Sequence, residues 1–144
     1  MTAYELNNRL KNYNLTAEIA KAMKMTKDKM ADKNREQLKR GRNTINNRIQ
    51  PRYKSKNDAK KKSARNSRPG FGVPDLNDLG DFHKAIDVKI TVKQYEFINS
   101  DIKAPMLIDK YPLILGMSAK STEEYSKDTL LPILKANLKK RISK

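Results

Sequence analysis

The side chains that could carry out chemistry gather around the only histidine of this 144-residue chain, His83. Carboxylate and imidazole groups at this density could bind a divalent cation or serve a metal-dependent nuclease. The spacing is more typical of a structural role. Aspartates that flank a glycine act as turn and cap residues, and the alternation of the predicted strand places Asp87 on its solvent face. We therefore predict no enzyme activity, no metal and no cofactor. The aspartates concerned are Asp75, Asp78, Asp81 and Asp87.

Two other kinds of site are excluded by composition. The chain has no cysteine, so it has neither a disulfide framework nor a thiolate metal site. Gly70 and Gly72 lie between prolines and lack the lysine and helix that follow in a phosphate-binding loop.

The strongest signal is charge, and it is concentrated in residues 33–68. This segment has 14 Lys and Arg against two acids, so it carries +12 of the chain's net charge of +16. Such a density favours a polyanionic partner, for example the backbone of nucleic acid. Tyr53 is the only aromatic residue in the segment, so base stacking and sequence-specific recognition are not supported.

The basic segment is predicted to contain three parts. Residues 33–40 form the exposed face of a helix end, residues 41–53 a structured turn, and residues 54–68 an arm without apolar periodicity that is mobile until a partner orders it. The candidate residues for contact with DNA or a protein partner are Arg48, Arg52, Lys54, Lys56, Lys60, Lys61, Lys62, Arg65 and Arg68.

The composition allows one domain whose core lies in the flanks of the basic segment. Hydrophobic residues make up 37% of the chain and the mean hydropathy is −0.87, yet the C-terminal half contains dense aliphatic runs. No run approaches the roughly 20 apolar residues of a transmembrane helix, and no apolar leader begins the chain. We expect a soluble protein of the cytoplasm, or of a particle assembled there.

Helical spacing dominates the N-terminal part. A short helix is predicted over residues 3–11, followed by a long helix over residues 15–40 with one apolar and one basic face. Gly41 follows a Lys-Arg pair and is a suitable C-terminal cap. The Pro-Gly pair at residues 69 and 70 marks a hinge that leads back to the folded unit.

The C-terminal part mixes strands and helices. Apolar and polar residues alternate from residue 86 to residue 92, which predicts a half-buried strand that returns in a hairpin over residues 95–98. A helix with proline in its first turn follows over residues 104–111, and then a short edge strand or packed loop over 113–115. A last helix is predicted from a capping box at Ser121 and Glu124, with a kink or division at Pro132.

Together these elements predict an α+β fold. It has a long N-terminal helix, a basic extended arm, a small antiparallel sheet and a C-terminal helix. Residues 1–14 form an N-terminal extension, and residues 15–144 form a single domain into which the basic arm, residues 41–72, is inserted.

Four segments resemble a family of small virion proteins of tailed phages and prophages, of the neck, tail-completion or minor-tail type found in Bacteroides-type phages. The segments are REQLKRG (35–41), PRYKS (51–55), LNDLGDFHKAIDVKI (76–90) and NSDIKAPMLIDKYPLILGMS (99–118). The matching residues are Gln37, Leu38, Gly41, Pro51, Tyr53, Gly80, Asp81, Phe82, Ser100, Asp101, Lys103, Leu107, Lys110, Tyr111, Gly116 and Ser118. Leu79 and Pro112 depart from the family's usual threonine and glycine.

The resemblance implies a non-enzymatic subunit that assembles with copies of itself into a six- or twelve-fold ring at the head-to-tail junction. Its partners would be portal, connector or tail proteins, with packaged double-stranded DNA close to the basic arm, and no membrane. The protein would be assembled in the host cytoplasm and reside in the virion. The alternative from charge alone is a non-specific DNA-binding protein. A metal-dependent nuclease that uses Asp78, Asp81 and His83 is the least favoured reading.

Overall fold

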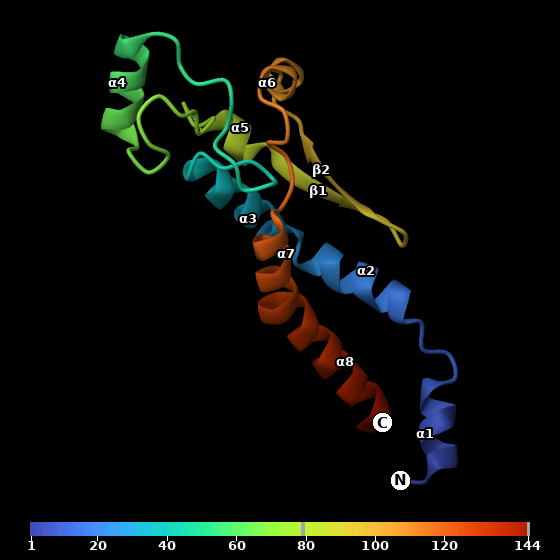
Figure 1. Cartoon of the computed structure of the whole chain (residues 1–144). Helices are drawn as coiled ribbons and strands as arrows, with labels where there is room; N and C mark the ends of the chain where they lie inside the picture. The colour runs from blue at the N-terminus through green and yellow to red at the C-terminus, as the bar shows by residue number, and fades with distance from the viewer. Residues whose placement is uncertain (79, 144) are drawn as a thin grey trace.

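The computed structural model describes residues 1–78 and 80–143, and its elements form an elongated molecule with two parts (Figure 1). One part, here called the limb, contains both termini and the helices α1, α2 and α8. The other part, the body, contains α3 to α7 and the hairpin. The elements are α1 (Ala3–Leu10), α2 (Leu15–Met25), α3 (Lys27–Lys39), α4 (Lys56–Arg65), α5 (Asp81–Lys84), β1 (Ile86–Ile90), β2 (Tyr95–Asn99), α6 (Ala104–Lys110), α7 (Ala119–Tyr125), η1 (Ser126–Leu130) and α8 (Leu131–Ser143).

The predicted mixture of helices and a small antiparallel sheet is confirmed. The single helix predicted over residues 15–40 is wrong, because α2 and α3 are separated at Thr26. The Thr26 hydroxyl donates to the carbonyl of Ala22 at 2.8 Å and shares a hydrogen bond of 2.7 Å with the Tyr125 hydroxyl. A threonine that bonds back to the preceding turn bends a helix, and here it also fastens the bend to α7.

Helix α3 organises the body through two side-chain amides on one face. Asn34, which is fully buried, donates to the carbonyl of Ile114 at 2.8 Å and accepts from the N–H of Gly116 at 3.2 Å. One turn later, Gln37 donates to the carbonyl of Gly116 at 3.0 Å and accepts from the N–H of Ser118 at 2.7 Å. The predicted edge strand or packed loop at 113–115 is therefore a packed loop, whose backbone pairs with side chains of a helix.

The hairpin forms as predicted and has the predicted buried aliphatic face, but β1 ends at Ile90, and Val92, predicted to continue the strand, is 57% exposed. Strands β1 and β2 are antiparallel, with Val88 opposite Phe97. Ile86 and Val88 are each 3% exposed and point toward the core beneath α3. Arg35 of α3 donates to the carbonyl of Ile86 at 2.9 Å, so one cation of the basic segment joins the helix to the start of the sheet.

The core lies between α3, the hairpin and the loop that precedes α7. Its buried members come mainly from the two flanks of the basic segment, and the segment itself contributes few of them. They are Met23, Met30, Ala31, Leu38, Ile49, Phe82, Ile86, Val88, Ala104, Tyr111, Ile114 and Tyr125.

The part of the arm that was predicted to be without regular structure is a helix, so that prediction is wrong. Helix α4 begins at a cap in which the Ser55 hydroxyl accepts from the N–H of Asp58. Ala59 is 3% exposed and Lys62 is 6% exposed, and both therefore face the body. Apolar periodicity gave no sign of this face, because one of its two buried positions is a lysine.

The C-terminal helices form a rod that passes through a π-helical turn (Figure 1). The predicted cap at Ser121 is wrong: Ser118 is the N-cap, and its hydroxyl accepts from the N–H of Ser121 at 3.2 Å. The N–H of Leu131 donates to the carbonyl of Ser126, five residues earlier. Pro132 follows this widened turn, which accommodates a residue that has no N–H to donate.

Two further predicted helices are confirmed. Helix α1 lies in the predicted segment 3–11 and begins with a capping box between Thr2 and Glu5. Helix α6 begins as predicted, with Pro105 in its first turn. None of the described helices is both long enough and apolar enough to cross a membrane. Leu79, one of the two departures from the family pattern, lies outside the described residues.

Candidate functional site

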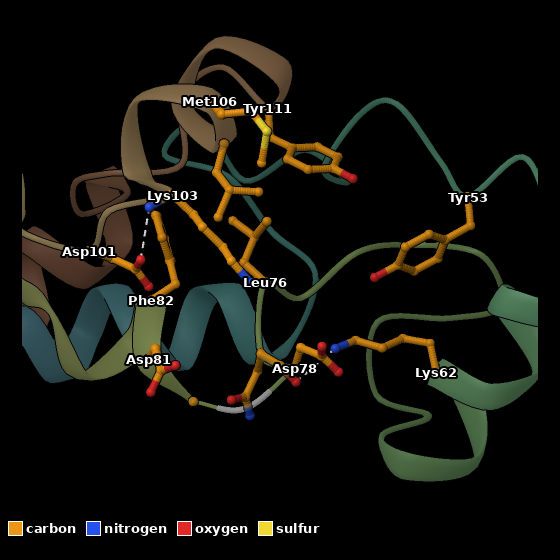
Figure 2. Close-up of a pocket in the computed structure, with 13 residues that line it drawn as sticks. Tyr53, Lys62, Leu76, Asp78, Asp81, Phe82, Asp101, Lys103, Met106 and Tyr111 are labelled. Atoms are coloured by element: carbon orange, nitrogen blue, oxygen red, sulfur yellow. Dashed lines mark hydrogen bonds between the residues drawn. The ribbon is translucent and has the colours of Figure 1, made fainter.

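Residues that carry the family resemblance meet around a cavity of about 290 Å³ (Figure 2). The cavity lies between the loop before α4, the segment that leads into α5, and helix α6. These segments are far apart in the sequence, so only the fold brings them together. The matching residues that line it are Tyr53, Gly80, Asp81, Phe82, Asp101, Lys103, Leu107 and Tyr111.

The inner wall of this cavity is apolar and aromatic. Phe82 and Tyr111 are 4% and 5% exposed, and the ammonium of Lys110 lies 5.2 Å from the centre of the Tyr111 ring. Tyr53 points across the cavity from the loop before α4 (Figure 2). Burial, with the nearby Tyr111 phenol and an acidic side chain, raises the pKa of Tyr53 to about 12. Its hydroxyl is therefore neutral at physiological pH and can donate a hydrogen bond.

The polar groups at the rim are occupied by structural contacts. Asp101 accepts from the N–H of Lys103 at 2.9 Å, which shapes the turn into α6. Asp78 forms an ion pair with Arg65 of α4, and the hydrogen bond from that guanidinium lowers the pKa of Asp78. The site can therefore receive an apolar side chain between charged edges, and its described lining residues do not place a nucleophile beside a base.

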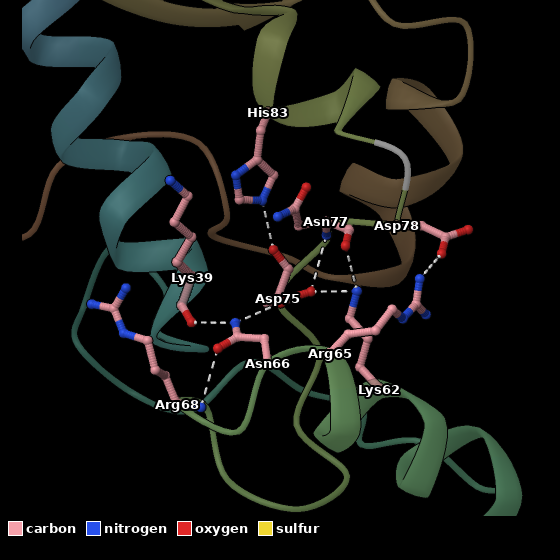
Figure 3. Close-up of polar contacts among 9 residues, drawn as sticks. All are labelled: Lys39, Lys62, Arg65, Asn66, Arg68, Asp75, Asn77, Asp78 and His83. Carbon is pink, nitrogen blue, oxygen red and sulfur yellow. Dashed lines mark hydrogen bonds and ion pairs between the residues drawn. The ribbon is translucent and has the colours of Figure 1, made fainter.

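Lys62, which lines the cavity, belongs to a buried ion pair whose contacts are shown in Figure 3. The ammonium of Lys62 lies 2.6 Å from the Asp75 carboxylate, and the side chains are 8% and 1% exposed. Lys62 also donates to the carbonyl of Asn77 at 2.7 Å, and Asn66 donates to the second Asp75 oxygen at 2.8 Å. Lys62 was predicted to contact DNA or a partner; here it fastens α4 to the body.

His83 is buried next to this pair and is not arranged as a metal ligand. Its Nε2 lies 2.7 Å from the carbonyl oxygen of Asp75, and among the described residues its Nδ1 has no partner. A carbonyl can only accept, so Nε2 carries the hydrogen and Nδ1 is bare. Burial lowers the pKa of His83. Over residues 1–78 and 80–143, no three His, Asp or Glu side chains come together as a metal site.

The other predicted arm residues are spread over several surfaces. Arg65 pairs with Asp78 and Arg68 with Glu36, while Arg52 donates to the carbonyl of Phe71 at 3.1 Å. The exposed predicted residues that take no part in any ion pair of the described chain are Arg48, Arg52, Lys54, Lys56, Lys60 and Lys61.

A second concave surface gathers four arginines around about 470 Å³ of space. They are Arg40, Arg42, Arg48 and Arg68. Sequence reasoning assigned Arg48 and Arg68 to the arm but did not include the first two. The sequence signal that could have identified Arg40 and Arg42 is the density of cations on both sides of Gly41.

Two glycines of the family pattern lie outside the cavity and have packing roles. Gly41 has φ +68°, and a Cβ there would lie 2.5 Å from the Cβ of Pro69. Gly116 has φ +137°, and a Cβ there would lie 2.9 Å from a methyl of Thr44. Both positions therefore require glycine for their backbone conformation and for close approach.

Comparisons with protein-family models, curated proteins and solved structures find no match to this chain. A functional proposal therefore rests on the geometry above and on the motif resemblance.

Proposed function

We propose that this chain is a structural virion protein of a tailed phage, a ring-forming neck or tail-completion subunit that joins the portal or connector to the tail. It acts by binding copies of itself and its neighbours in the particle. It is assembled in the host cytoplasm and functions in the virion.

The observation that carries this proposal is the open edge of the hairpin. Thr91 donates to the carbonyl of Gln94 at one end of the ladder, and Ser100 donates to the carbonyl of Ala85 at the other. The alternation of an antiparallel ladder then directs the backbone N–H and C=O groups of Tyr95 and Phe97 away from β1. Within the described residues, β2 has no second partner strand. Such an edge is a template for pairing with another chain.

The hairpin also exposes apolar side chains to solvent, which is unfavourable for a two-stranded sheet. Strand β2 has no buried residue, and Tyr95 and Ile98 are 42% and 38% exposed. Two strands alone are marginally stable in water, and additional strands or helices stabilise them. A neighbouring copy in a ring would supply both the hydrogen bonds and the apolar cover.

The rim of the cavity supports the same reading. Met106, which lines the cavity, is 61% exposed, and Ile102, which lies between the lining residues Asp101 and Lys103 in the chain, is 94% exposed. Exposed aliphatic side chains around an apolar hollow are typical of a protein interaction surface. Residues of the family pattern gather at this surface, as expected for positions that contact other virion proteins.

Two measurements test the proposal. Mass photometry of the purified full chain should show a closed oligomer, and mass spectrometry of purified phage particles should detect the chain as a component. A protein that stays monomeric over the accessible concentration range and is absent from particles would contradict it.

A matched pair of variants tests the edge of β2 in particular. Ile98→Lys places a charge beside the open edge and should shift the protein toward the monomer, because lysine at an edge discourages strand pairing. Ile108→Lys is the control, since Ile108 on α6 is also 38% exposed. Equal effects of the two substitutions would contradict pairing through β2.

A further inference from the structure

The four-arginine surface, here called the arginine groove, is a built feature of the fold. It lies between the C-terminal end of α3, the loop of residues 42–48 and the turn that follows α4. Arg40 closes α3, Arg42 and Arg48 face each other across an isolated antiparallel bridge, and Arg68 comes from the turn. The end of α3 and the loop are consecutive in the chain, and tertiary contacts bring the distant turn against them.

The backbone around the groove is held in place. Asn43 accepts at its side-chain oxygen from the N–H groups of Ile45 and Asn47, at 3.1 and 3.0 Å, which shapes the loop between Arg42 and Arg48. Gly41 lies directly against Pro69, so the loop and the turn keep their spacing. The guanidinium groups are therefore gathered before any ligand arrives, and ordering them for binding costs less.

The charges of the groove are not balanced within it. Glu36 is the acid that contacts these arginines, through ion pairs with Arg40 and Arg68. Four guanidinium groups against one carboxylate leave a net positive hollow. In addition, like charges directly opposite each other across a bridge repel, as Arg42 and Arg48 do. An anion between them would remove that repulsion.

We propose that the arginine groove binds the phosphodiester backbone of double-stranded nucleic acid. The planar donor fork of arginine suits the paired oxygens of a phosphate. The lining contains no aromatic side chain, so the contact follows the backbone and does not stack on bases. It also lacks the large apolar anchors that an acidic protein partner would use.

This proposal keeps Arg48 and Arg68 of the predicted contact residues, adds Arg40 and Arg42, and leaves out the cations of α4. Lys62 and Arg65 of α4 are engaged with Asp75 and Asp78. The arginine groove combines concavity with cations from three segments, whereas the remaining cations of α4 lie on one exposed helix face. The proposal does not depend on ring assembly, and either can fail without the other.

The test compares two variants of equal net charge in the full chain. Arg42→Gln/Arg48→Gln removes two cations from the groove, and Lys60→Gln/Lys61→Gln removes two from the exposed face of α4. Binding to a fluorescent DNA duplex of mixed sequence is measured by anisotropy over a range of salt concentrations. The slope of log K against log salt reports the number of phosphates neutralised, at about 0.9 for each in duplex DNA.

In the groove variant we expect the magnitude of that slope to decrease by about two and the affinity to fall tenfold or more. In the α4 variant both changes should be several times smaller. Equal losses in the two variants would overturn the proposal, because binding would then follow net charge alone. It would also be overturned if the wild-type protein bound no duplex, or if polyglutamate of equal charge competed as well as DNA.

A single substitution keeps the test valid if the double variant unfolds. Arg48 is exposed and makes no side-chain hydrogen bond in the described chain, so Arg48→Gln should leave the melting temperature unchanged. It should still reduce the slope by about one, and Lys61→Gln should reduce it less. Mass photometry of the same variants separates this outcome from any effect on assembly.

Discussion

Helices α3 and α8 have the same length, 13 residues each, but opposite environments. Helix α3 lies in the body and has five buried residues: Met30, Ala31, Asn34, Gln37 and Leu38. Helix α8 lies in the limb and has none, although it has the more continuous aliphatic stripe: Leu131, Ile133, Leu134, Leu138 and Ile142. The more apolar helix is thus the less buried one.

This difference shows that the single chain buries its own side chains in the body but leaves them incompletely covered in the limb. The body buries both aliphatic and polar groups, and among the described residues its buried polar side chains are paired except at the Nδ1 of His83. The limb is held at its free end by reciprocal contacts in which Arg141 donates to the carbonyl of Arg9 at 2.9 Å and Arg9 donates to the carbonyl of Ile142. Its apolar stripe is half-buried, apart from the exposed Leu131. Four predictions test this contrast between the body and the limb.

The largest effect is expected from the buried ion pair of the body. Asp75→Ala leaves the Lys62 ammonium buried without its partner and should reduce the free energy of unfolding by about 3–5 kcal/mol. The measurement is urea denaturation followed by circular dichroism. Asp78→Ala is the control, because its pair with Arg65 is exposed to solvent and should contribute little. If Asp75→Ala were as stable as this control, the pair would not hold α4.

A leucine from each helix tests the contrast directly. Leu38→Ala on α3 empties a fully buried position and should cost about 2–5 kcal/mol. Leu138→Ala on α8 removes a half-buried side chain and should cost about 1 kcal/mol in the monomer. Thermal denaturation at a concentration below any self-association compares the two. Equal costs would mean that α8 is packed as firmly as α3.

An asparagine from each helix isolates the polar contribution. Asn34→Ala removes the partner of two backbone groups in the loop before α7 and should cost about 1–3 kcal/mol. Asn137→Ala on α8 removes a half-buried amide that makes no side-chain hydrogen bond within the described chain, and should be close to neutral. Hydrogen exchange should show faster exchange at Gly116 in the first variant only. Unchanged exchange there would contradict the proposed role of Asn34.

The smallest effect is a dependence of stability on pH through His83. Its pKa is lowered by burial, so the unfolded state takes up a proton before the folded state as the pH falls. The free energy of unfolding should therefore decrease below about pH 6.5, by at most about 1.4 kcal/mol for each pH unit. His83→Gln retains a donor toward the Asp75 carbonyl and should remove this dependence. Denaturation curves between pH 5 and pH 8 make the measurement.

Local patterns predicted much of the fold. Strict alternation indicated the hairpin and its buried face, and Pro105 marked the beginning of α6. The division at Thr26 could not be predicted, because it depends on a bond with Tyr125, ninety-nine positions along the chain. Helix α4 escaped prediction for a related reason: a lysine occupies one of its two buried positions, and hydrophobic periodicity does not register a charge whose partner is distant.

The candidate sites divide in the same way. The amino-acid sequence determined that the cations are concentrated in residues 33–68, because charge is a property of composition. The motif resemblance named some of the residues that line the cavity, but the sequence predicted no cavity there. Only the tertiary structure decided which cations are buried, as Lys62 is, and which converge on the arginine groove. The physical reason is that desolvation and pairing depend on the neighbours of a charged group, and these neighbours come from segments that only folding brings together.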